Sequence, residues 1–215
     1  MEQTDIVCPF CGCLCDDLEV SIEDGHITGL KNGCAVSRSK FLNHGDHRVL
    51  SATVDNEPKS VEDAVKAAVE ILSKAKRPLI YGLSSTECGA ISKAIEIAEV
   101  TGGVLDNTAS VCHGPTILAL QQVGESKASL GDIMNRADLV VFWGANPTEA
   151  HMRHITRYSV MPKGMYVDGR KGRKVIAVDV RKTSTARLAD KFIQVAPSGD
   201  YELLQTLRAI VRGEE

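Results

Sequence analysis

Five of the seven cysteines in this 215-residue chain lie within its first 34 residues, and no other feature constrains the fold as strongly. Four of them, Cys8, Cys11, Cys15 and Cys34, follow the spacing C-x2-C-x3-C-x18-C. A [4Fe–4S] cluster needs four thiolates, one for each iron, and a short loop with one later cysteine can supply them. The spacing therefore predicts an iron–sulfur cluster in the N-terminal region, and with it a redox function.

Two other uses of these cysteines fit the sequence less well. Disulfides suit small exported domains, but the N-terminal residues contain no apolar stretch of the signal-peptide kind. Structural zinc sites usually show two paired Cys or Cys/His knuckles, and no second pair follows here. Cys13 lies between two candidate ligands and could replace Cys11 or Cys15, so the residues by themselves leave that choice open.

The overall composition is that of an ordinary globular protein. Hydrophobic residues make up 43% and aromatic residues only 4%, so we expect an aliphatic core. The net charge of −3 argues against a nucleic-acid partner, and we interpret the basic stretch 170–174 as a solvated loop before a strand. No apolar run reaches membrane-spanning length. Reduced thiols without an export signal favour a cytoplasmic, anaerobic setting.

The sequence pattern changes at about residue 55. Residues 18–30 predict a strand, a turn and a return strand, and Cys34 arrives just after this hairpin. A module of this size has a small core, so a bound metal should contribute to its folding. We therefore predict an iron–sulfur module over residues 1–55 and an α/β domain over residues 56–215.

Beyond residue 55, helical and strand patterns alternate. Ser60 and Asp63 resemble a capping box that starts a helix with one apolar face. The alternation favours a Rossmann-like, mostly parallel α/β sheet with right-handed crossovers. The predicted strands are 79–83, 104–105, 139–143, 175–180 and 192–195, and further helices cover 90–98, follow Pro115 and begin near Tyr201.

Ligands of open α/β sheets bind beyond the carboxyl ends of the strands. Gly144 permits close approach to the backbone, and Pro147 suits a first helical turn whose free N–H groups face an anion. Asp179 ends a strand, where an acid commonly accepts hydrogen bonds from a ribose or a purine. Each segment alone is more often an ordinary turn, but together they predict one extended nucleotide-like ligand. The three segments that follow predicted strands are 143–151, 178–183 and 196–200.

Cys112 and His113 form another candidate site, between a short strand and a helix. A thiol near a helix N-terminus has a lowered pKa and makes a good metal ligand or nucleophile. The adjacent imidazole could move a proton. Without further context a merely buried cysteine beside a loop histidine is the favoured interpretation, because free cysteines are usually buried.

The motifs together resemble molybdopterin oxidoreductases of the formate dehydrogenase type. The resemblance rests on the cysteine block, G-x-N-P-x-E-x-H over 144–151, D-x-R over 179–181, and Gly199-Asp200. Within that group, the chain is most similar to the B subunit of formylmethanofuran dehydrogenase. This similarity is carried by Cys8-Pro-Phe-Cys11-Gly-Cys13-Leu-Cys15-Asp16-Asp17, Asn32-Gly33-Cys34 and Ser110-Val111-Cys112-His113-Gly114, and it runs along the whole chain.

The resemblance implies two metal sites. One is a [4Fe–4S] cluster on Cys8, Cys11, Cys15 and Cys34, which leaves Cys13 as the spare thiol. The other is tungsten or molybdenum held by two pyranopterin guanine dinucleotides, a sulfido group and the soft Cys112 thiolate, with His113 beside the substrate. The implied cofactor-binding residues are Gly144, Asn146, Pro147, Glu149, His151, Asp179, Arg181, Gly199 and Asp200.

The activity implied by the resemblance is reduction of CO2 to formate in methanogenesis. Electrons would enter through the cluster, and formate would pass to a partner amidohydrolase subunit. The other implied partners are a small pterin-binding subunit and a polyferredoxin-type subunit. Two alternatives remain: a generic formate dehydrogenase subunit, and a non-catalytic electron-transfer or scaffold subunit of the same fold.

The chain departs from the family pattern in two respects. Relatives commonly carry a lysine two residues beyond the fourth cysteine, where this chain has Val36; Arg38 or Lys40 could take its place. The family subunit is also about twice as long, and its second half, which includes an active-site arginine, is missing from this sequence.

The remaining histidines carry less information. His151 and His154 could share a metal if both lay on one helix, but two ligands make a weak site. We expect His151 near the pterin and His154 on a helix surface. His44 and His47 flank a Gly-Asp loop and show no clear signal.

Overall fold

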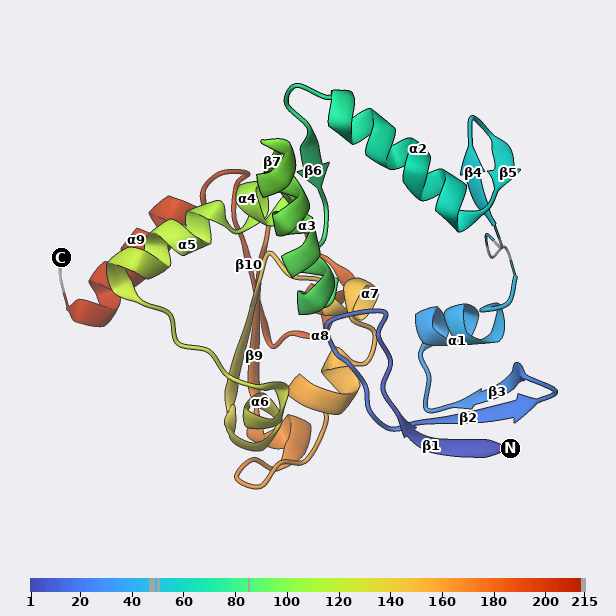
Figure 1. Cartoon of the computed structure of the whole chain (residues 1–215). Coiled ribbons are helices and arrows are strands. Elements are labelled where there is room, and N and C mark those ends of the chain that lie inside the picture. Colours follow the sequence, from blue (N-terminus) through green and yellow to red (C-terminus); the bar gives the residue numbers. More distant parts are fainter. Residues whose placement is uncertain (47–48, 50, 85, 214–215) are drawn as a thin grey trace. The chain divides into compact units, whose positions relative to one another are not determined.

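The computed structural model describes residues 1–46, 49, 51–84 and 86–213, so His47 lies outside the described residues (Figure 1). The chain forms two compact units. Unit 1 combines residues 1–47 with 127–215, and unit 2 comprises residues 48–126. Compactness therefore groups the cysteine region with the C-terminal part of the chain, while the predicted functional division at residue 55 stays a prediction.

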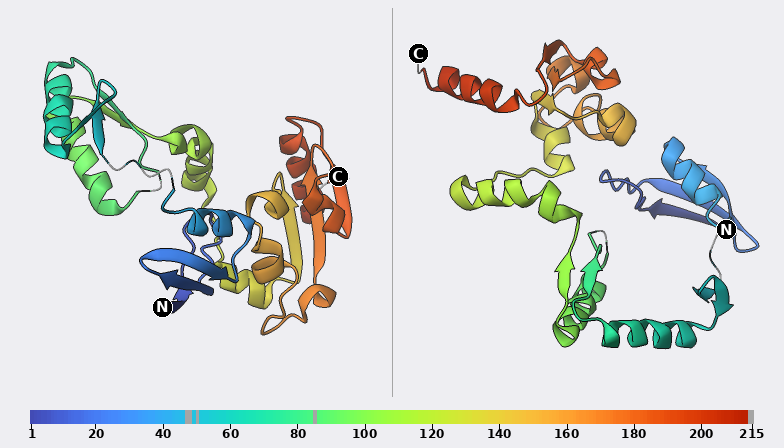
Figure 2. Two further views of the ribbon diagram at one scale, coloured as in Figure 1. Left: turned by 90° about the vertical axis from the view of Figure 1, so that its right-hand side faces the viewer. Right: turned by 90° about the horizontal axis from the view of Figure 1, so that it is seen from above.

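The N-terminal part of unit 1 is a three-stranded antiparallel sheet in the order β1-β2-β3, formed by Glu2–Ile6, Leu18–Glu23 and His26–Lys31. Helix α1 (Ala35–Leu42) contacts β3 and covers one face of the sheet (Figure 2). The β2–β3 hairpin confirms the predicted strand–turn–strand pattern. Strand β1 was not predicted, because its four leading residues are exposed and show no apolar alternation.

Thiols and aliphatic side chains together form the core of this small sheet. Leu18, Val20 and Leu30 are buried against three cysteines of the loop that joins β1 to β2. Partly buried side chains, including Phe41 of α1 and Tyr158 from the C-terminal region, close the core. Because this core contains only a few aliphatic side chains, the cysteines make up a large part of it.

The C-terminal part of unit 1 contains the parallel sheet β10-β9-β8, formed by Lys191–Gln194, Lys174–Asp179 and Leu139–Trp143. All three strands were predicted. Trp143 pairs with Val178, and Gln194 pairs with Asp179. Because the strands are parallel and in this register, their carboxyl ends lie along one edge, where the three predicted ligand segments begin.

Helical elements surround this sheet, and most are too short to show periodicity in the sequence. Ser129 and Asp132 form a capping box at the start of α6, in which each side chain accepts from the backbone N–H of the other residue. The sequence contains this pattern, but the helix was not predicted. Helix α9 begins at Asp200, one residue before the predicted start. The elements are α6 (Leu130–Arg136), α7 (Pro147–Ala150), a π-helix (His154–Ser159), a 3-10 turn (Gly169–Gly172), α8 (Ser184–Leu188) and α9 (Asp200–Arg212).

Arg173 corrects the interpretation of 170–174 as a solvated loop. Its side chain is buried, and its guanidinium donates to the carbonyl oxygens of Ala137 (3.0 Å), Val160 (3.2 Å) and two further residues of this unit. Burial lowers the pKa of Arg173. Composition could not reveal this role, because the acceptors are backbone carbonyls that carry no side-chain signal.

Unit 2 contains the parallel pair β6-β7 (Leu79–Tyr81 and Val104–Asp106), which confirms the two strands predicted there. The predicted cap at Ser60 is confirmed, since its hydroxyl accepts from the N–H of Asp63 at 3.1 Å. The other elements are the hairpin β4-β5 (Ala52–Val54, Glu57–Lys59), α2 (Val61–Lys74), α3 (Cys88–Thr101), α4 (Thr108–Cys112) and α5 (Gly114–Val123).

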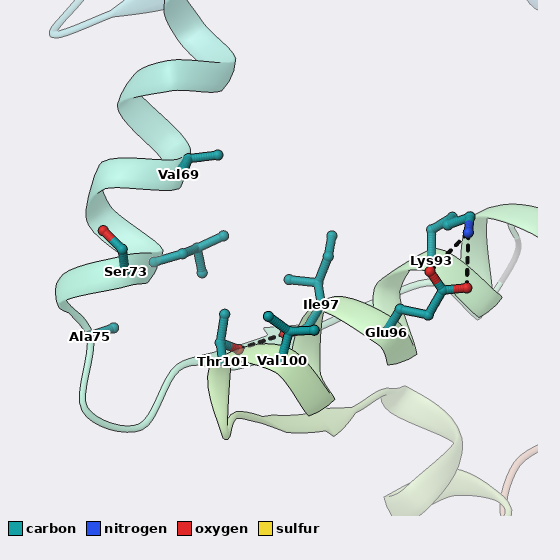
Figure 3. Close-up of a pocket in the computed structure, with 9 residues that line it drawn as sticks. Val69, Ser73, Ala75, Lys93, Glu96, Ile97, Val100 and Thr101 are labelled. Carbon is teal, nitrogen blue, oxygen red and sulfur yellow. Dashed lines mark hydrogen bonds and ion pairs between the residues drawn. The ribbon is translucent and has the colours of Figure 1, made fainter.

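A groove of about 660 Å³ lies between α2 and α3. Figure 3 shows Val69 of α2 and Ile97 and Val100 of α3 around it, with the ion pair between Lys93 and Glu96 at its margin. The apolar face predicted for α2 therefore exists, but Val69 stays exposed within this unit. The described residues that line the groove form no metal-ligand cluster. No helix in the described part of the chain is long and apolar enough to cross a membrane.

Candidate functional site

The cysteine loop folds around one enclosed cavity in unit 1. The loop closes on itself, because the Cys8 N–H donates to the Cys15 carbonyl oxygen at 2.8 Å, and Leu14 turns the chain with a φ of 41°. Sequence positions 26 residues apart thus meet at one place. The cysteines that line the cavity are Cys8, Cys11, Cys13, Cys15 and Cys34.

Cys34 is placed by a tight turn between β3 and α1, where it is the N-cap residue. A Cβ on Gly33 would lie 2.5 Å from Leu30 Cδ2 and 2.8 Å from Ser37 Oγ, so a side chain there would have to displace the buried side chains of Leu30 and Ser37. Burial raises the pKa of Cys34, but hydrogen bonds from the backbone and hydroxyl of Ser37 outweigh it, and the net shift is downward. The turn therefore favours the thiolate form of Cys34 over that of an isolated cysteine.

The pKa values of Cys8 and Cys13 shift in the opposite direction. Burial, reinforced by Cys11, raises the pKa of Cys13 to about 12, and burial also raises the pKa of Cys8. Thiols in this position lose their protons when a cation binds them. Within the described ranges, no three His, Cys, Asp or Glu side chains are placed to hold a single metal ion.

Two ion pairs join the cysteine loop to the segment after α7. Arg153 donates to both carboxylate oxygens of Asp17 at 2.6 and 2.7 Å, and Arg157 donates to Asp16 at 2.6 Å. The hydrogen bond from Arg153 lowers the pKa of Asp17. Asp16 and Asp17 directly follow the cysteines in the sequence, but their arginine partners are more than 130 residues away. No local pattern links the two segments, so the sequence did not predict these ion pairs.

The strand-end segments of β8 and β9 meet in a hydroxyl and amide network. Asn146 Oδ1 accepts from Thr185 Oγ1 at 2.7 Å and lies 2.9 Å from Thr148 Oγ1. Ser184 Oγ donates to Glu149 Oε1 at 2.6 Å, and this bond lowers the pKa of Glu149. Asn146 and Glu149 therefore hold the two loops together through side chains of α8 that sequence reasoning missed.

Other predicted residues lie at the same edge of the sheet. Trp143 Nε1 donates to Asp200 Oδ1 at 2.7 Å, which ties the end of β8 to the start of α9. Arg181 donates its N–H to Asp179 Oδ1 at 3.4 Å, and Gly199 caps α9. The structure thus brings the predicted segments 144–151, 179–181 and 199–200 to one edge, as parallel strands require.

A pocket of about 540 Å³ lies between this edge and the cysteine loop. Gly144, with a φ of 56°, lets the chain turn away from β8, and Pro147 begins α7 as predicted. A Cβ on Gly12 would lie 3.7 Å from His151 Nε2, so His151 sits directly beside the cysteine loop. The volume is that of a small-ligand site.

The expectation for His154 was wrong. It is half-buried rather than on a helix surface, because its ring packs edge-on against Phe142 with ring centroids 6.1 Å apart, and its Nδ1 lies 3.0 Å from Ser159 Oγ. Burial, followed by His151, lowers its pKa. His151 ends α7 whereas His154 begins the π-helix, so the arrangement of both imidazoles on one helix is not formed.

Cys112 and His113 belong to unit 2. Cys112 is the last residue of α4, and His113 both ends α4 and caps α5, so the thiol precedes a helix N-terminus as predicted. Cys112 is exposed, which removes the interpretation of a buried structural cysteine within this unit.

The candidates for the missing lysine, Arg38 and Lys40, lie exposed on α1, as does Val36. His44 is exposed as well. A basic residue that does line the cysteine cavity is Arg153.

Comparison with known proteins defines the class first. The chain is 24% identical over 226 residues, 95% of its length and 32% of the relative's, to F420-dependent formate dehydrogenase 2 subunit alpha of Methanococcus maripaludis. The crystal structure of the formyltransferase/hydrolase complex FhcABCD of Methylorubrum extorquens with methylofuran contains a chain of the same fold, with a TM-score of 0.58 at 23% identity over 73% of this chain and 42% of that one. No family model matches the chain. These two likenesses indicate the class: the chain is similar in sequence to a formate dehydrogenase alpha subunit and in fold to a chain of the FhcABCD complex.

A more specific likeness comes from a relative with much higher sequence identity than these two. The chain is 46% identical over 218 residues to the B subunit of the tungsten-containing formylmethanofuran dehydrogenase 2 of Methanocaldococcus jannaschii, covering 98% of this chain and 50% of that protein. The predicted resemblance is confirmed: this chain matches the N-terminal half of formylmethanofuran dehydrogenase B subunits. It spans about half the length of that relative.

Proposed function

We propose that this chain is the cluster- and cofactor-binding half of the B subunit of a formylmethanofuran dehydrogenase that reduces CO2 to formate. The observation that carries the proposal is the convergence of five cysteines on one cavity beside a ligand-sized pocket at the strand ends. Relatives named as tungsten-containing support a metal–pterin cofactor. The full activity, its substrates and the partner subunits belong to this proposal.

The cysteine cavity fits a [4Fe–4S] cluster better than a single zinc ion. Zinc needs four donors within about 2.3 Å of one point. The cavity-lining thiols are not arranged around a single ion in the described residues, whereas a cluster gives each thiolate a separate iron. Cys8, Cys11, Cys15 and Cys34 would hold it, with Cys13 as the spare thiol.

The pocket at the strand ends fits part of a pyranopterin guanine dinucleotide. Its walls come from the loop after β8 and from Gly12 of the cysteine loop, so a ligand there would lie next to the cluster. Asp179 and Arg181 supply an acceptor and a cation, and Gly199 and Asp200 begin a helix whose N–H groups suit an anion. We assign His151 to the same ligand, because it lines the pocket beside Gly12 of the cysteine loop.

Tungsten or molybdenum, when bound, would supply the two-electron chemistry at carbon. In this chain Cys112 would hold that metal as a thiolate, because a soft sulfur donor suits it. His113, fixed between α4 and α5, would donate a hydrogen bond to a substrate oxygen on which negative charge develops. The protein thereby contributes orientation and electrostatics, and the cofactor contributes the redox step.

The exposed thiols of unit 2 allow a matched test. Cys112→Ser in the purified complex should lower CO2 reduction more than about 100-fold, the loss expected when a direct metal ligand rather than its outer partner is removed. Cys88→Ser, which changes an exposed cysteine at the start of α3, should keep wild-type turnover. Near-normal turnover of Cys112→Ser with normal tungsten or molybdenum content would refute the ligand role and favour a scaffold subunit.

A further inference from the structure

Two arginines of the segment that follows α7 bind the acidic end of the cysteine loop. Arg153 lines the cavity, and Arg157 lies one turn further on in the π-helix. Their side chains are only 21% and 25% exposed, which is low for arginine. Neither residue belongs to the predicted site.

Carboxylates hold both guanidinium groups in fixed orientations. Asp17 binds Arg153 through two parallel hydrogen bonds and lies 3.1 Å from Arg157 Nη1, while Asp16 binds Arg157. Two-point arginine–carboxylate pairs restrict the guanidinium more than single contacts do. Arg153 itself lines the cavity, so the positive end of its pair faces the thiols.

Tyr158 completes this arrangement around one cysteine. Its hydroxyl accepts from Arg157 Nη1 at 2.6 Å, and it packs against the cysteine core. Burial, then hydrogen bonding with Cys15, raises the pKa of Tyr158 to about 12. Asp17 chiefly raises the pKa of Arg153, and Cys15 adds to that shift. Arg153 thus lines the same cavity as Cys15, and Tyr158, which Arg157 holds, packs against the core that contains Cys15.

Donors and cations at a cluster sulfur favour the more negative redox state. One-electron reduction adds one negative charge to a cluster and its thiolates, while no ligand bond forms or breaks. Hydrogen bonds to sulfur and the local charge are among the factors that set cluster potentials. Low solvent exposure increases the effect of each charge.

We infer that Arg153 and Arg157, oriented by Asp17 and Asp16, raise the reduction potential of the cluster bound by the cysteine loop. The inference rests on the proposed cluster. The two arginines are positioning residues, since they act through the Cys15 thiolate and make no contact with substrate. They also tie the cluster loop to His151 and its pocket, two residues before Arg153 in the chain.

The test is a redox titration of the purified complex, in which dithionite delivers single electrons and the paramagnetic signal of the reduced cluster is followed. Arg153→Gln and Arg157→Gln should each shift the reduction equilibrium about tenfold toward the oxidised state, which is about 59 mV for one electron. Arg153→Lys keeps the charge but loses the two-point contact, so it should shift less. The matched control is Arg170→Gln, which removes an arginine bound to Asp190 at 2.7 Å in another part of the unit and should leave the potential unchanged.

The outcomes separate the inference from the proposed function. The inference would be overturned if, at wild-type iron content, Arg153→Gln and Arg157→Gln had the same midpoint reduction potential as Arg170→Gln. The proposed cluster would not be affected by that result. If Arg153→Gln loses its iron, the midpoint potentials of Arg157→Gln and Arg153→Lys are compared with that of Arg170→Gln instead. Equal midpoints would again overturn the inference. A wild-type complex with no cluster signal assignable to this chain would instead overturn the proposed function.

Discussion

The seven cysteines differ in how far they are buried. Cys8, Cys13 and Cys15 are buried in the N-terminal core, and Cys11 and Cys34 are half-buried beside them. Spacing alone left Cys13 competing with its neighbours. In the structure all five line the same cavity, so the choice among them requires an experiment on single residues.

Serine substitutions should separate ligands from the spare thiol. Cys13→Ser is expected to keep wild-type iron, because the remaining four thiols satisfy the cluster. Cys15→Ser should lose most of the iron bound by this chain, since three thiols remain after the spare one is excluded. Iron is measured per chain after anaerobic purification. Loss of iron in Cys13→Ser together with full retention in Cys15→Ser would make Cys13 the ligand.

At the scale of elements, one ion pair secures the start of β9 against the start of β10. Asp190 accepts from the Val175 N–H at 2.7 Å and from Arg170 at 2.7 Å, while its own N–H donates to the Val175 carbonyl oxygen at 2.8 Å. Arg170, then the Val175 N–H, lowers the pKa of Asp190. This contact sits at the end of the sheet opposite the ligand segments.

The lowered pKa predicts a stability effect that depends on pH. A carboxyl with a depressed folded-state pKa stabilises fully above its unfolded value, about 3.9, and loses that contribution as the pH falls through the folded value. Asp190→Asn should therefore lower the urea midpoint of the full chain at pH 7, and the gap to wild type should narrow below about pH 4.

A second carboxylate serves as the control for that prediction. Asp168 pairs with Lys163 at 3.5 Å, but both side chains are largely exposed, so Asp168→Asn should hardly change the midpoint at any pH. A gap between wild type and Asp190→Asn that stays constant from pH 7 to pH 3 would contradict the linkage argument.

At the scale of the whole molecule, the sequence predicted what depends on local pattern. The β2–β3 hairpin, the three strands of the parallel sheet and the cap at Ser60 all follow from alternation, apolar runs and capping residues. The edge that gathers Asn146, Asp179 and Asp200 followed from parallel topology. Identity to relatives confirmed the resemblance that the motifs had indicated.

What the sequence did not predict depends on contacts between distant residues. The pairing of Arg153 with Asp17, the backbone contacts of Arg173 and the packing of His154 on Phe142 all join segments with no shared local pattern. The compact units mix the first and last parts of the chain for the same reason. Such contacts appear only when the fold places the segments together.

The most direct test of the central claim is elemental analysis of the complex that contains this chain, purified without oxygen, for tungsten, molybdenum, iron and zinc. We predict one tungsten or molybdenum per copy of this chain and iron in excess of the share of the other subunits. Iron without either heavy metal, in a preparation shown to retain its pterin, would contradict a catalytic role and make this chain an electron-transfer or scaffold component.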